Sequence, residues 1–432
     1  MTTDSLRTPV DDVAAVDVVV IGAGQAGLSA AAHLRRSGFA PVDDPVPGAP
    51  TFVVLDAADG PGGAWRERWP SLTMRTVHGV YELPNRPIPT FEPEQSAVDV
   101  LPPYFGDFEA TEGLRVRRPV QVRAVRNAPD GPGLLAVDTV DRSGMPVGPV
   151  PVDPERSIEV PDDLLGCGAG AERRVGAPAA TPSMPAVPRR VRRTWLARTL
   201  VNATGTWTRP FWPVYPGQRD FAGVQLHTHD YRGPEDFADR DVIVVGGGSS
   251  AAQHLLAIAP VARSTTWATR RPPEWVDAAF SPELGREAVA RVEQRTRAGL
   301  PPASIVSATG LSLTPEYRAG IESGVLRARP MFERLVPEGA TWAPGPVPEG
   351  WTDGPELVRA DVVLWATGFR PAVDHLAALK LRHRNGGIEL DGTRAVVDPR
   401  VHLVGYGPSA STVGANRAGR AAAREVRRLL DA

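Results

Sequence analysis

Three glycines near the start of the chain have the spacing of a dinucleotide-binding turn. Gly22, Gly24 and Gly27 form the pattern G-x-G-x-x-G between an apolar run, Asp17-Val-Val-Val-Ile21, and a segment of helical composition that reaches Arg36. In such a turn the first glycine allows the tight bend, the second lets the backbone approach a pyrophosphate, and the third lets the helix pack on the strand. The pyrophosphate then lies at the helix N-terminus. We therefore predict a dinucleotide site at this turn.

A carboxylate about 20 positions after the last glycine is expected to bind ribose hydroxyls. Asp56 ends the next strand pattern but lies further from Gly27 than this spacing. The intervening segment 41–50 holds four prolines and is interpreted as a loop insertion, whose removal restores the expected spacing. Asp56 is therefore the predicted ribose ligand. The alternative is that the glycines form only a tight structural turn.

A second motif, Gly246, Gly248 and Ala251, follows another apolar strand pattern. Alanine is accepted at the third position, where the helix packs on the strand. Arg270 stands at the corresponding distance after Ala251, and it is followed by Arg271 and by no carboxylate. Arginine suits a 2′-phosphate, so this site is predicted to bind NADP(H) rather than NAD(H). Two solvated surface arginines are the alternative.

Two dinucleotide sites in one chain predict a flavin in one and a nicotinamide in the other, because hydride passes readily between these cofactors. The segment Pro61-Gly-Gly-Ala-Trp65 follows the acidic strand of the first site. Its glycines would let the backbone approach a flavin, and Trp65 would form an apolar wall. A plain turn and a core tryptophan are the alternative. We therefore expect FAD in the first site and NADPH in the second.

Composition and charge exclude several classes of protein. Lys plus Arg is 48 and Asp plus Glu is 50, a balance that argues against a nucleic-acid partner. Cys167 is the only cysteine, which excludes an internal disulfide, a redox-active cysteine pair and a four-cysteine zinc site. No metal site is predicted. Residues 1–15 lack a signal pattern, and no apolar run approaches the ~18 residues of a membrane span, so we expect a cytoplasmic protein.

The elements that position these motifs predict an α/β fold with two Rossmann-like dinucleotide-binding domains, the second inserted in the first. Apolar runs predict strands at 17–21, 51–56, 241–245 and 361–365, and a further strand is predicted at 264–269. The FAD domain is assigned to residues 14–212 and 371–432, and the NADPH domain to residues 213–370. The proline-rich stretch 143–190 is expected to be a flexible insert, because its prolines supply neither ladder hydrogen bonds nor a helix. The segment 272–339 is expected to cover a substrate site.

The stretch before the second glycine motif adds a resemblance to a known family. Phe221, Gly223, His227 and Tyr231 reproduce the pattern F-x-G-x-x-x-H-x-x-x-[YF], and this chain thereby resembles the flavin-containing, NADPH-dependent monooxygenases over nearly its whole length. It is most similar to their soluble bacterial and plant branch. Tyr231 stands where the related Baeyer–Villiger enzymes carry tryptophan, which favours oxygenation of a heteroatom or side chain. His227 is expected to have a structural role near the domain junction, with a general base as the alternative.

The resemblance implies an FAD-dependent monooxygenase that uses NADPH and O2, through a C4a-hydroperoxyflavin, to oxygenate a small organic substrate. The chemistry is borne by the flavin, so no catalytic side chain is assigned. The alternatives are an NADPH-dependent flavin reductase without oxygen insertion, and a flavin-binding protein without turnover. A homo-oligomer is left open, and no membrane partner is expected. Beyond the glycines, Asp56 and the two arginines, the predicted cofactor contacts are Gln25, Ala26, Gly63, Ala64, Trp65, Val120, Thr204, Gly205, Ser249, Ser250, Thr367, Gly368 and Gly405.

Overall fold

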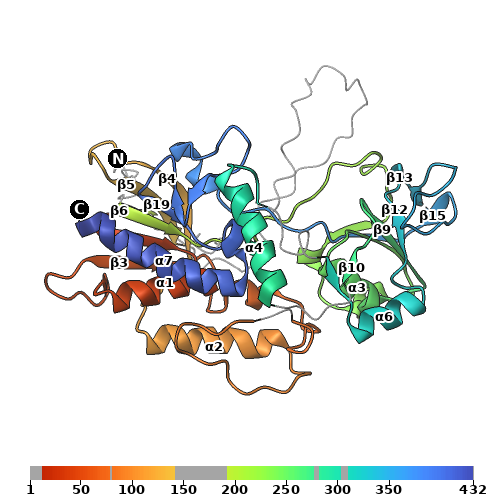
Figure 1. Cartoon of the computed structure of the whole chain (residues 1–432), viewed down its shortest axis with the longest axis horizontal. Helices are drawn as coiled ribbons and strands as arrows, with labels where there is room; N and C mark the ends of the chain where they lie inside the picture. Colours follow the sequence, from red (N-terminus) through yellow and green to blue (C-terminus); the bar gives the residue numbers. More distant parts are fainter. Residues whose placement is uncertain (1–11, 78–79, 142–191, 277–281, 303–309, 432) are drawn as a thin grey trace, which may run out of the picture.

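The computed structural model describes residues 12–77, 80–141, 192–276, 282–302 and 310–431. The chain forms two halves that lie side by side, each built around a parallel β-sheet (Figure 1). The predicted α/β class with two Rossmann-like units is confirmed. The predicted insert 143–190, which contains Cys167, lies outside the described residues.

The sheet of the first half has the order β17-β18-β19-β6-β1-β3-β2, and the hairpin β4-β5 joins it through antiparallel pairing of β5 with β6. The central strands β19, β6, β1 and β3 are parallel to one another. The described strands are β1 (Asp12–Ile21), β2 (Ala40–Pro41), β3 (Thr51–Leu55), β4 (Val120–Asn127), β5 (Leu135–Asp141), β6 (Arg192–Asn202), β17 (Leu390–Asp391), β18 (Arg394–Ala395) and β19 (Val401–Leu403).

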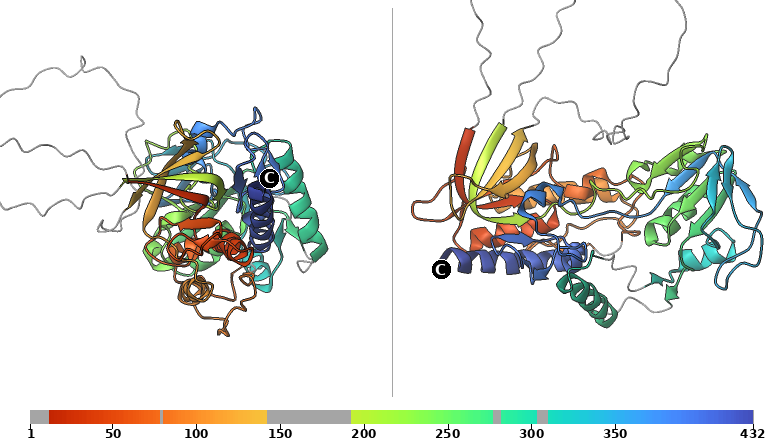
Figure 2. Two further views of the ribbon diagram at one scale, coloured as in Figure 1. Left: turned by 90° about the vertical axis from the view of Figure 1, so that its left-hand side faces the viewer. Right: turned by 90° about the horizontal axis from the view of Figure 1, so that it is seen from above.

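Residues 18–21, at the end of β1, are buried on both faces, which explains the apolar run there. Val18 and Val20 pack in one core cluster with residues of three helices, whereas Val19 and Ile21 pack in a second cluster with the β4-β5 hairpin. The elements that cover the two faces are α1 (Gln25–Arg36), α2 (Ala97–Thr111), η1 (Gly63–Glu67), η5 (Asp374–Leu379), η6 (Gly407–Ala410) and α7 (Thr412–Asp431). Helices α1 and α7 lie side by side on one face (Figure 2).

The sheet of the second half has the order β12-β9-β8-β16-β7, and all its pairings are parallel. A small antiparallel sheet, β13-β14-β15, accompanies it. The strands are β7 (Val224–His227), β8 (Asp241–Val245), β9 (Ser264–Thr269), β10 (Trp275–Val276), β11 (Leu311–Ser312), β12 (Ala328–Pro330), β13 (Arg334–Val336), β14 (Gly339–Thr341), β15 (Leu357–Arg359) and β16 (Val362–Trp365), and the helices are η3 (Thr228–Asp230), η4 (Pro234–Phe237), α3 (Ser249–Ile258) and α6 (Pro315–Glu322). The chain between β10 and β11 also contains helix α4 (Pro282–Arg297).

The segment 272–339, expected to cover a substrate site from within the second domain, does not lie in one place. Strand β12 and helix α6 belong with the second half, but α4 lies against η6 and β17 of the first half (Figure 1). The chain after α4 stays there, since Asn385 Nδ2 donates to the Ala298 carbonyl (2.8 Å) and Gly387 N donates to the Gly299 carbonyl (2.9 Å). Parts of this segment, 277–281 and 303–309, lie outside the described residues.

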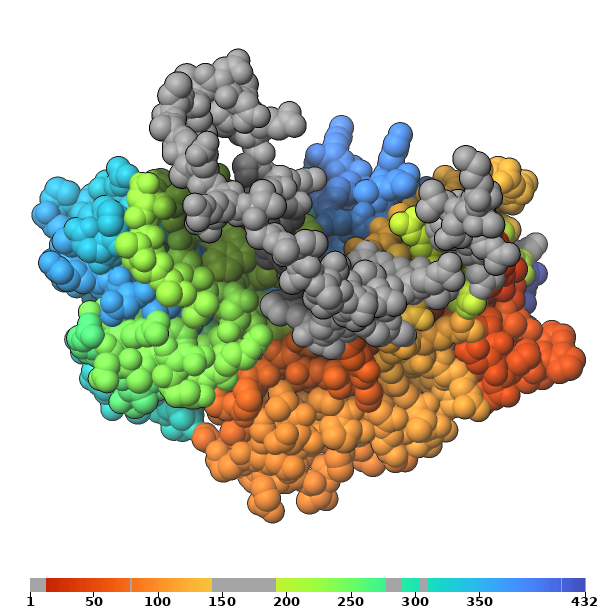
Figure 3. Space-filling model, turned by 180° about the vertical axis from the view of Figure 1, so that it is seen from behind, coloured from red at the N-terminus to blue at the C-terminus, as the bar shows by residue number. Residues whose placement is uncertain are grey.

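Two stretches of chain connect the halves and run past each other in opposite directions. Pro210 and Phe369 form an antiparallel bridge, and the Phe211 N–H donates to the Gly368 carbonyl (2.9 Å). The halves also share a core cluster, in which residues 69–101 of the first half pack with residues of β8, α3 and β16. Seen from behind, atoms of the first half border directly on those of the second (Figure 3). None of the helices in the described part of the chain is long and apolar enough to span a membrane.

Candidate functional site

The first glycine motif forms a tight turn between β1 and α1. Gly22 has a φ of +96°, and a Cβ there would lie 2.6 Å from the Ala203 carbonyl oxygen. A Cβ at Gly27 would lie 1.9 Å from the Gly22 carbonyl oxygen, so the third glycine is required for packing of the helix on the turn. Gly24, at the N-cap of α1, differs from both, because a Cβ placed there would meet no atom within 4 Å. The open side of the turn is therefore at the predicted pyrophosphate position.

Other predicted FAD contacts gather at the same edge of the sheet, where β1, β3, β6 and β19 end. A Cβ on Gly63 would lie 2.8 Å from Gly24 Cα, and a Cβ on Gly405 would lie 3.6 Å from Ala26 Cβ and 4.0 Å from Gly205 Cα. The carboxyl ends of parallel strands are the usual place for a nucleotide in this kind of fold. Segments that are far apart in the sequence thus meet there by tertiary folding alone.

Asp56 follows β3 directly and is 8 % exposed. Its Oδ2 accepts a hydrogen bond from Arg118 Nε (2.7 Å), while the two Nη atoms of Arg118 bind both oxygens of Glu109 (2.7 and 2.6 Å). A carboxylate accepts about four hydrogen bonds, so Asp56 retains capacity for ribose hydroxyls. The N–H of Val120, another predicted contact, donates to the Asp56 carbonyl (2.8 Å) and is therefore engaged within the protein.

Gln25, the first residue of α1, has a buried amide. Its Nε2 donates to the carbonyls of Tyr81 (2.8 Å) and Thr412 (3.3 Å), but its Oε1 is shielded and has no partner among the described residues. A buried acceptor without a partner is costly and suits a site that a donor-bearing ligand completes. Three features together fit a flavin dinucleotide at this edge: the unpartnered Oε1 of Gln25, the unobstructed Cβ position of Gly24 and the spare acceptor capacity of Asp56.

The second glycine motif repeats the geometry of the first between β8 and α3. Gly246 has a φ of +143°, and a Cβ there would lie 2.2 Å from the Ala366 carbonyl oxygen. No atom lies within 4 Å of a Cβ placed at Gly248, the N-cap of α3. Ser249 and Ser250 form the first turn of the helix and are half-buried. A second open helix N-terminus is therefore available for a phosphate group.

Arg270 and Arg271 lie directly after β9 and are both exposed. Across the parts of the chain that the structure describes, neither forms an ion pair with a carboxylate. The last residue of β9, Thr269, is buried, and its Oγ1 accepts a hydrogen bond from Trp351 Nε1 (2.9 Å). The two guanidinium groups thus stand at the end of the strand next to β8, where the sequence places the 2′-phosphate ligand.

The two Ala-Thr-Gly segments hold the crossing chains together. Thr204 Oγ1 donates to the Ala372 carbonyl (2.6 Å), and Thr367 Oγ1 donates to the Phe211 carbonyl (2.5 Å). The Gly205 carbonyl accepts from the Ala372 N–H (2.9 Å). The hydroxyls of Thr204 and Thr367 therefore form hydrogen bonds within the protein. Any cofactor contact of Thr204, Gly205, Thr367 and Gly368 would come from the backbone.

His227 is fully buried at the end of β7, next to this crossing. Its Nδ1 accepts from the His229 N–H (3.0 Å), so the ring proton lies on Nε2, which donates to the Gly368 carbonyl (3.0 Å). Burial lowers the pKa of His227 to about 4, so the ring is neutral near pH 7. Both ring nitrogens are occupied by backbone groups. This geometry favours the structural role over the general base.

Sequence reasoning missed a cluster of rings at the junction of the halves. Trp69 lies 4.9 Å from His254 of α3 and 5.6 Å from Tyr231, measured between ring centroids. Trp207 stacks on Phe369, with centroids 4.7 Å apart, and the guanidinium of Arg68 lies 4.0 Å from the Trp207 centroid. The aromatic and basic residues Trp65, Arg68 and Trp69, which closely follow the Gly-Gly pair in the sequence, could have indicated this cluster.

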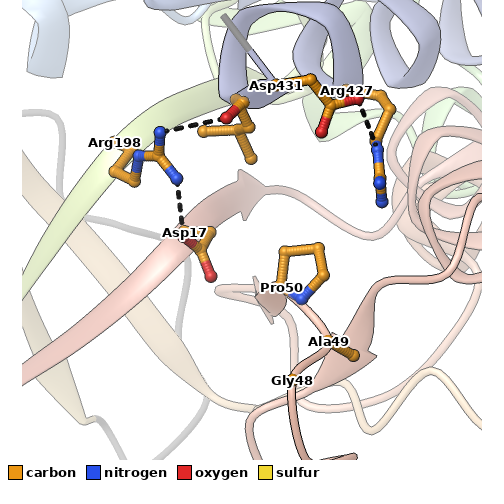
Figure 4. Close-up of a pocket in the computed structure, with 8 residues that line it drawn as sticks. Asp17, Gly48, Ala49, Pro50, Arg198, Arg427 and Asp431 are labelled. Carbon is orange, nitrogen blue, oxygen red and sulfur yellow. Dashed lines mark hydrogen bonds and ion pairs between the residues drawn. The ribbon is translucent and has the colours of Figure 1, made fainter.

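An open cavity lies elsewhere, between the end of α7 and the turn before β3 (Figure 4). It measures about 420 Å³, and its charges are paired, Arg198 with Asp17 (3.4 Å) and Arg427 with Asp431 (2.9 Å). It contains no predicted site residue. In the described ranges, no group of three or more His, Cys, Asp or Glu side chains is placed to hold a metal ion.

Comparisons with known proteins identify the family of this chain. Residues 195–282 match the family model "Flavin-binding monooxygenase-like". The flavin-containing monooxygenase from Stenotrophomonas maltophilia is similar in structure, with a TM-score of 0.68 and 32% identity, covering 96% of this chain and 99% of that chain. An indole-3-pyruvate monooxygenase from Oryza sativa subsp. japonica is 28% identical over 253 residues, covering 57% of this chain and 47% of the relative. A Baeyer–Villiger monooxygenase from Streptomyces coelicolor is 28% identical over 267 residues, covering 60% of this chain and 39% of the relative.

The matched part of the chain spans less than half the length of these two curated relatives, whereas the match with the Stenotrophomonas enzyme covers nearly all of both chains. The latter similarity combines 32% identity with nearly complete coverage of both chains. The chain belongs to the flavin-containing monooxygenases.

Proposed function

We propose that this protein is an FAD-dependent monooxygenase that uses NADPH and O2 to oxygenate a small organic substrate. The single observation that supports it most is the pair of open glycine turns, at Gly24 and Gly248, in a chain similar over nearly its whole length to a flavin-containing monooxygenase. Bound FAD would supply the redox chemistry that activates dioxygen. The proposal includes the oxygen-insertion route that the family resemblance implies.

The protein's own residues would bind and orient the cofactors. Gly24 and the N-terminus of α1 would hold the FAD pyrophosphate, and Asp56 would accept hydrogen bonds from its ribose. Gly248 and the N-terminus of α3 would hold the NADPH pyrophosphate, with Arg270 and Arg271 on the 2′-phosphate. The aromatic rings at the junction would exclude water from the space between the two cofactors.

Labelled dioxygen provides the direct test. The FAD-loaded protein is incubated with NADPH, 18O2 and a panel of thioethers, amines and ketones, and products are analysed by mass spectrometry. A product with one labelled atom is the expected result. NADPH oxidation coupled only to reduction of an acceptor, without label in any product, would favour the flavin reductase instead. A cytoplasmic location and a homo-oligomer stay predictions.

A further inference from the structure

Arg68 is a cation enclosed by tryptophan rings where the two halves meet. Its guanidinium carbon lies 4.0 Å from the centroid of Trp207 and 5.8 Å from those of Trp65 and Trp69. These rings come from the Gly-Gly turn after β3 and from the first crossing chain. A guanidinium over an aromatic face is held by electrostatic attraction to the ring, which partly replaces the water it loses.

The enclosed guanidinium has no carboxylate partner. Arg68 forms no ion pair or hydrogen bond through its side chain with any described residue, and its Nε is fully shielded without an acceptor. Trp207 Nε1, in the same cluster, is a second shielded donor without an acceptor. By contrast, the comparably enclosed Arg118 binds two carboxylates. Arg68 Nε and Trp207 Nε1 are therefore two shielded N–H donors for which the described residues supply no acceptor.

Arg68 stays charged in spite of its enclosure. Burial lowers its pKa to about 10, which is still well above neutral. The residue as a whole is half-buried, so part of the side chain remains reachable although Nε is not. An enclosed cation that keeps its charge and lacks a counter-ion is the group expected to recognise an anion.

The position of Arg68 favours a substrate anion over a phosphate of NADPH. Arg68 comes directly after η1, the turn that carries the predicted flavin contacts Gly63 and Trp65. Its neighbour Trp69 packs on His254, which lies in the middle of α3 and not at its phosphate-binding N-terminus. The predicted phosphate ligands, Gly248 and the arginines after β9, lie on other segments.

We propose that Arg68 binds the carboxylate of the substrate and that the surrounding tryptophans contact its apolar or aromatic body. The enzyme is then selective for small organic acids over neutral molecules of the same shape. This inference rests on the proposed function, in which the junction between the two cofactor sites receives the substrate. A charge-assisted hydrogen bond of about 1.5–3 kcal/mol corresponds to about a tenfold to hundredfold preference.

The test starts with binding, which requires no turnover. Benzoate and its neutral isostere benzamide are titrated by calorimetry into FAD-loaded wild type, Arg68→Met, Arg68→Lys and Arg66→Met. Arg66 is an exposed arginine of the same turn, so its replacement is a control with the same change of charge. Wild type and Arg66→Met should bind benzoate at least tenfold more tightly than benzamide. Arg68→Met should bind both equally, and Arg68→Lys should keep part of the preference.

Equal binding of benzoate and benzamide by wild type would overturn the proposal, as would a preference retained by Arg68→Met. Folding of Arg68→Met is judged by thermal unfolding and flavin content. If this variant does not fold, the charge-conserving Arg68→Lys decides the question. Loss of the whole preference for benzoate over benzamide in folded Arg68→Lys counts against a charge-based site, and partial retention of that preference supports it. A higher KM for NADPH in Arg68→Met, with unchanged benzoate binding, would assign the residue to the nucleotide and overturn the proposal.

Turnover measurements then distinguish a failure of this inference from a failure of the proposed function. With 4-(methylsulfanyl)benzoate and thioanisole as paired thioethers, Arg68→Met should raise KM about tenfold to hundredfold for the acid and less than about twofold for the neutral compound. If neither thioether is oxygenated while wild type still prefers benzoate, sulfur oxygenation is wrong and the anion site stands. If both are oxygenated and Arg68→Met treats them as wild type does, the monooxygenase stands and the anion site is wrong.

Discussion

Replacing Gly24 with alanine should weaken FAD binding and leave the folded apoprotein nearly unchanged. Gly24 has φ −77° and ψ −175°, which any residue adopts, and a Cβ there meets no atom within 4 Å. Alanine is a poorer N-cap than glycine by about 0.5–1 kcal/mol. Alanine also lowers the conformational entropy of the unfolded chain, which stabilises the folded state by about 0.4–1 kcal/mol. The free energy of unfolding of the apoprotein should therefore change by less than about 1 kcal/mol.

The same methyl group would occupy the space through which the pyrophosphate approaches the backbone. Forcing an extra methyl into a filled site costs about 1–3 kcal/mol. FAD affinity should therefore fall by about fivefold to 150-fold. Gly24→Val, with a branched side chain, should remove FAD altogether. The measurements are fluorescence titration of the apoprotein with FAD and urea unfolding of the same preparations.

Two other glycines supply the controls. Gly248→Ala has an equally open Cβ position, at the N-cap of α3, and should weaken NADP⁺ binding and leave FAD affinity unchanged. Gly27→Ala should destabilise the apoprotein itself, because its Cβ would lie 1.9 Å from a carbonyl oxygen. Wild-type FAD affinity in Gly24→Ala would refute the placement of the pyrophosphate. An equal loss of FAD in Gly248→Ala would refute the separation of the two sites.

Three further predictions concern the second site, the ribose ligand and pH. Replacing Arg270 and Arg271 by alanine should raise KM for NADPH by about tenfold to hundredfold and change KM for NADH little; equal rises for both would rule out a 2′-phosphate contact. Asp56→Asn should weaken FAD binding about tenfold. Glu109→Gln, which also removes a partner of Arg118, should lower the free energy of unfolding by about 1–3 kcal/mol and leave FAD binding unchanged. Similar FAD titrations for the two variants would contradict the assignment of Asp56 to the ribose. Burial lowers the pKa of His227, His375 and His402 to about 4 each, so the unfolded chain binds more protons between about pH 6.5 and pH 4. The free energy of unfolding, measured by urea titration, should therefore fall as the pH is lowered through that window, by up to about 1.4 kcal/mol per pH unit for each histidine. The variant His402→Phe should show a smaller dependence on pH. A free energy of unfolding that is constant from pH 6.5 to pH 5 would show that these rings are not held neutral.

The elements that carry the two glycine motifs were predictable from the sequence. Strands β8 and β9 begin and end at the predicted residues, and β3 and β16 each differ from the prediction by one residue at one end. Strands β3, β8 and β16 are buried along almost their whole length and appear as apolar runs, which are local signals. The glycine spacing is equally local, because one turn of backbone and the helix after it determine which positions tolerate a side chain. The predicted fold class followed from these signals.

The partners of the site residues depended on tertiary packing. Asp56 binds Arg118, which is 62 positions away, and the guanidinium of Arg68 faces Trp207, which is further still along the chain. Nothing in the spacing of the sequence indicates such pairs, because they form only when separate elements pack. For the same reason, the sequence assigned residues 282–297 to the NADPH domain, whereas the structure packs α4 against η6 and β17 of the first half, where backbone hydrogen bonds hold the chain that follows it.

The sequence by itself therefore determined the two open helix N-termini, whose chemistry resides in consecutive residues. Only the tertiary structure decided what lies between them. The ring cluster at the junction assembles side chains from η1, α3 and both crossing chains, and the charge of Arg68 within it depends on burial and on the lack of an ion pair with any described carboxylate. Burial and counter-ion pairing are properties of the packed interior and have no counterpart in a linear pattern.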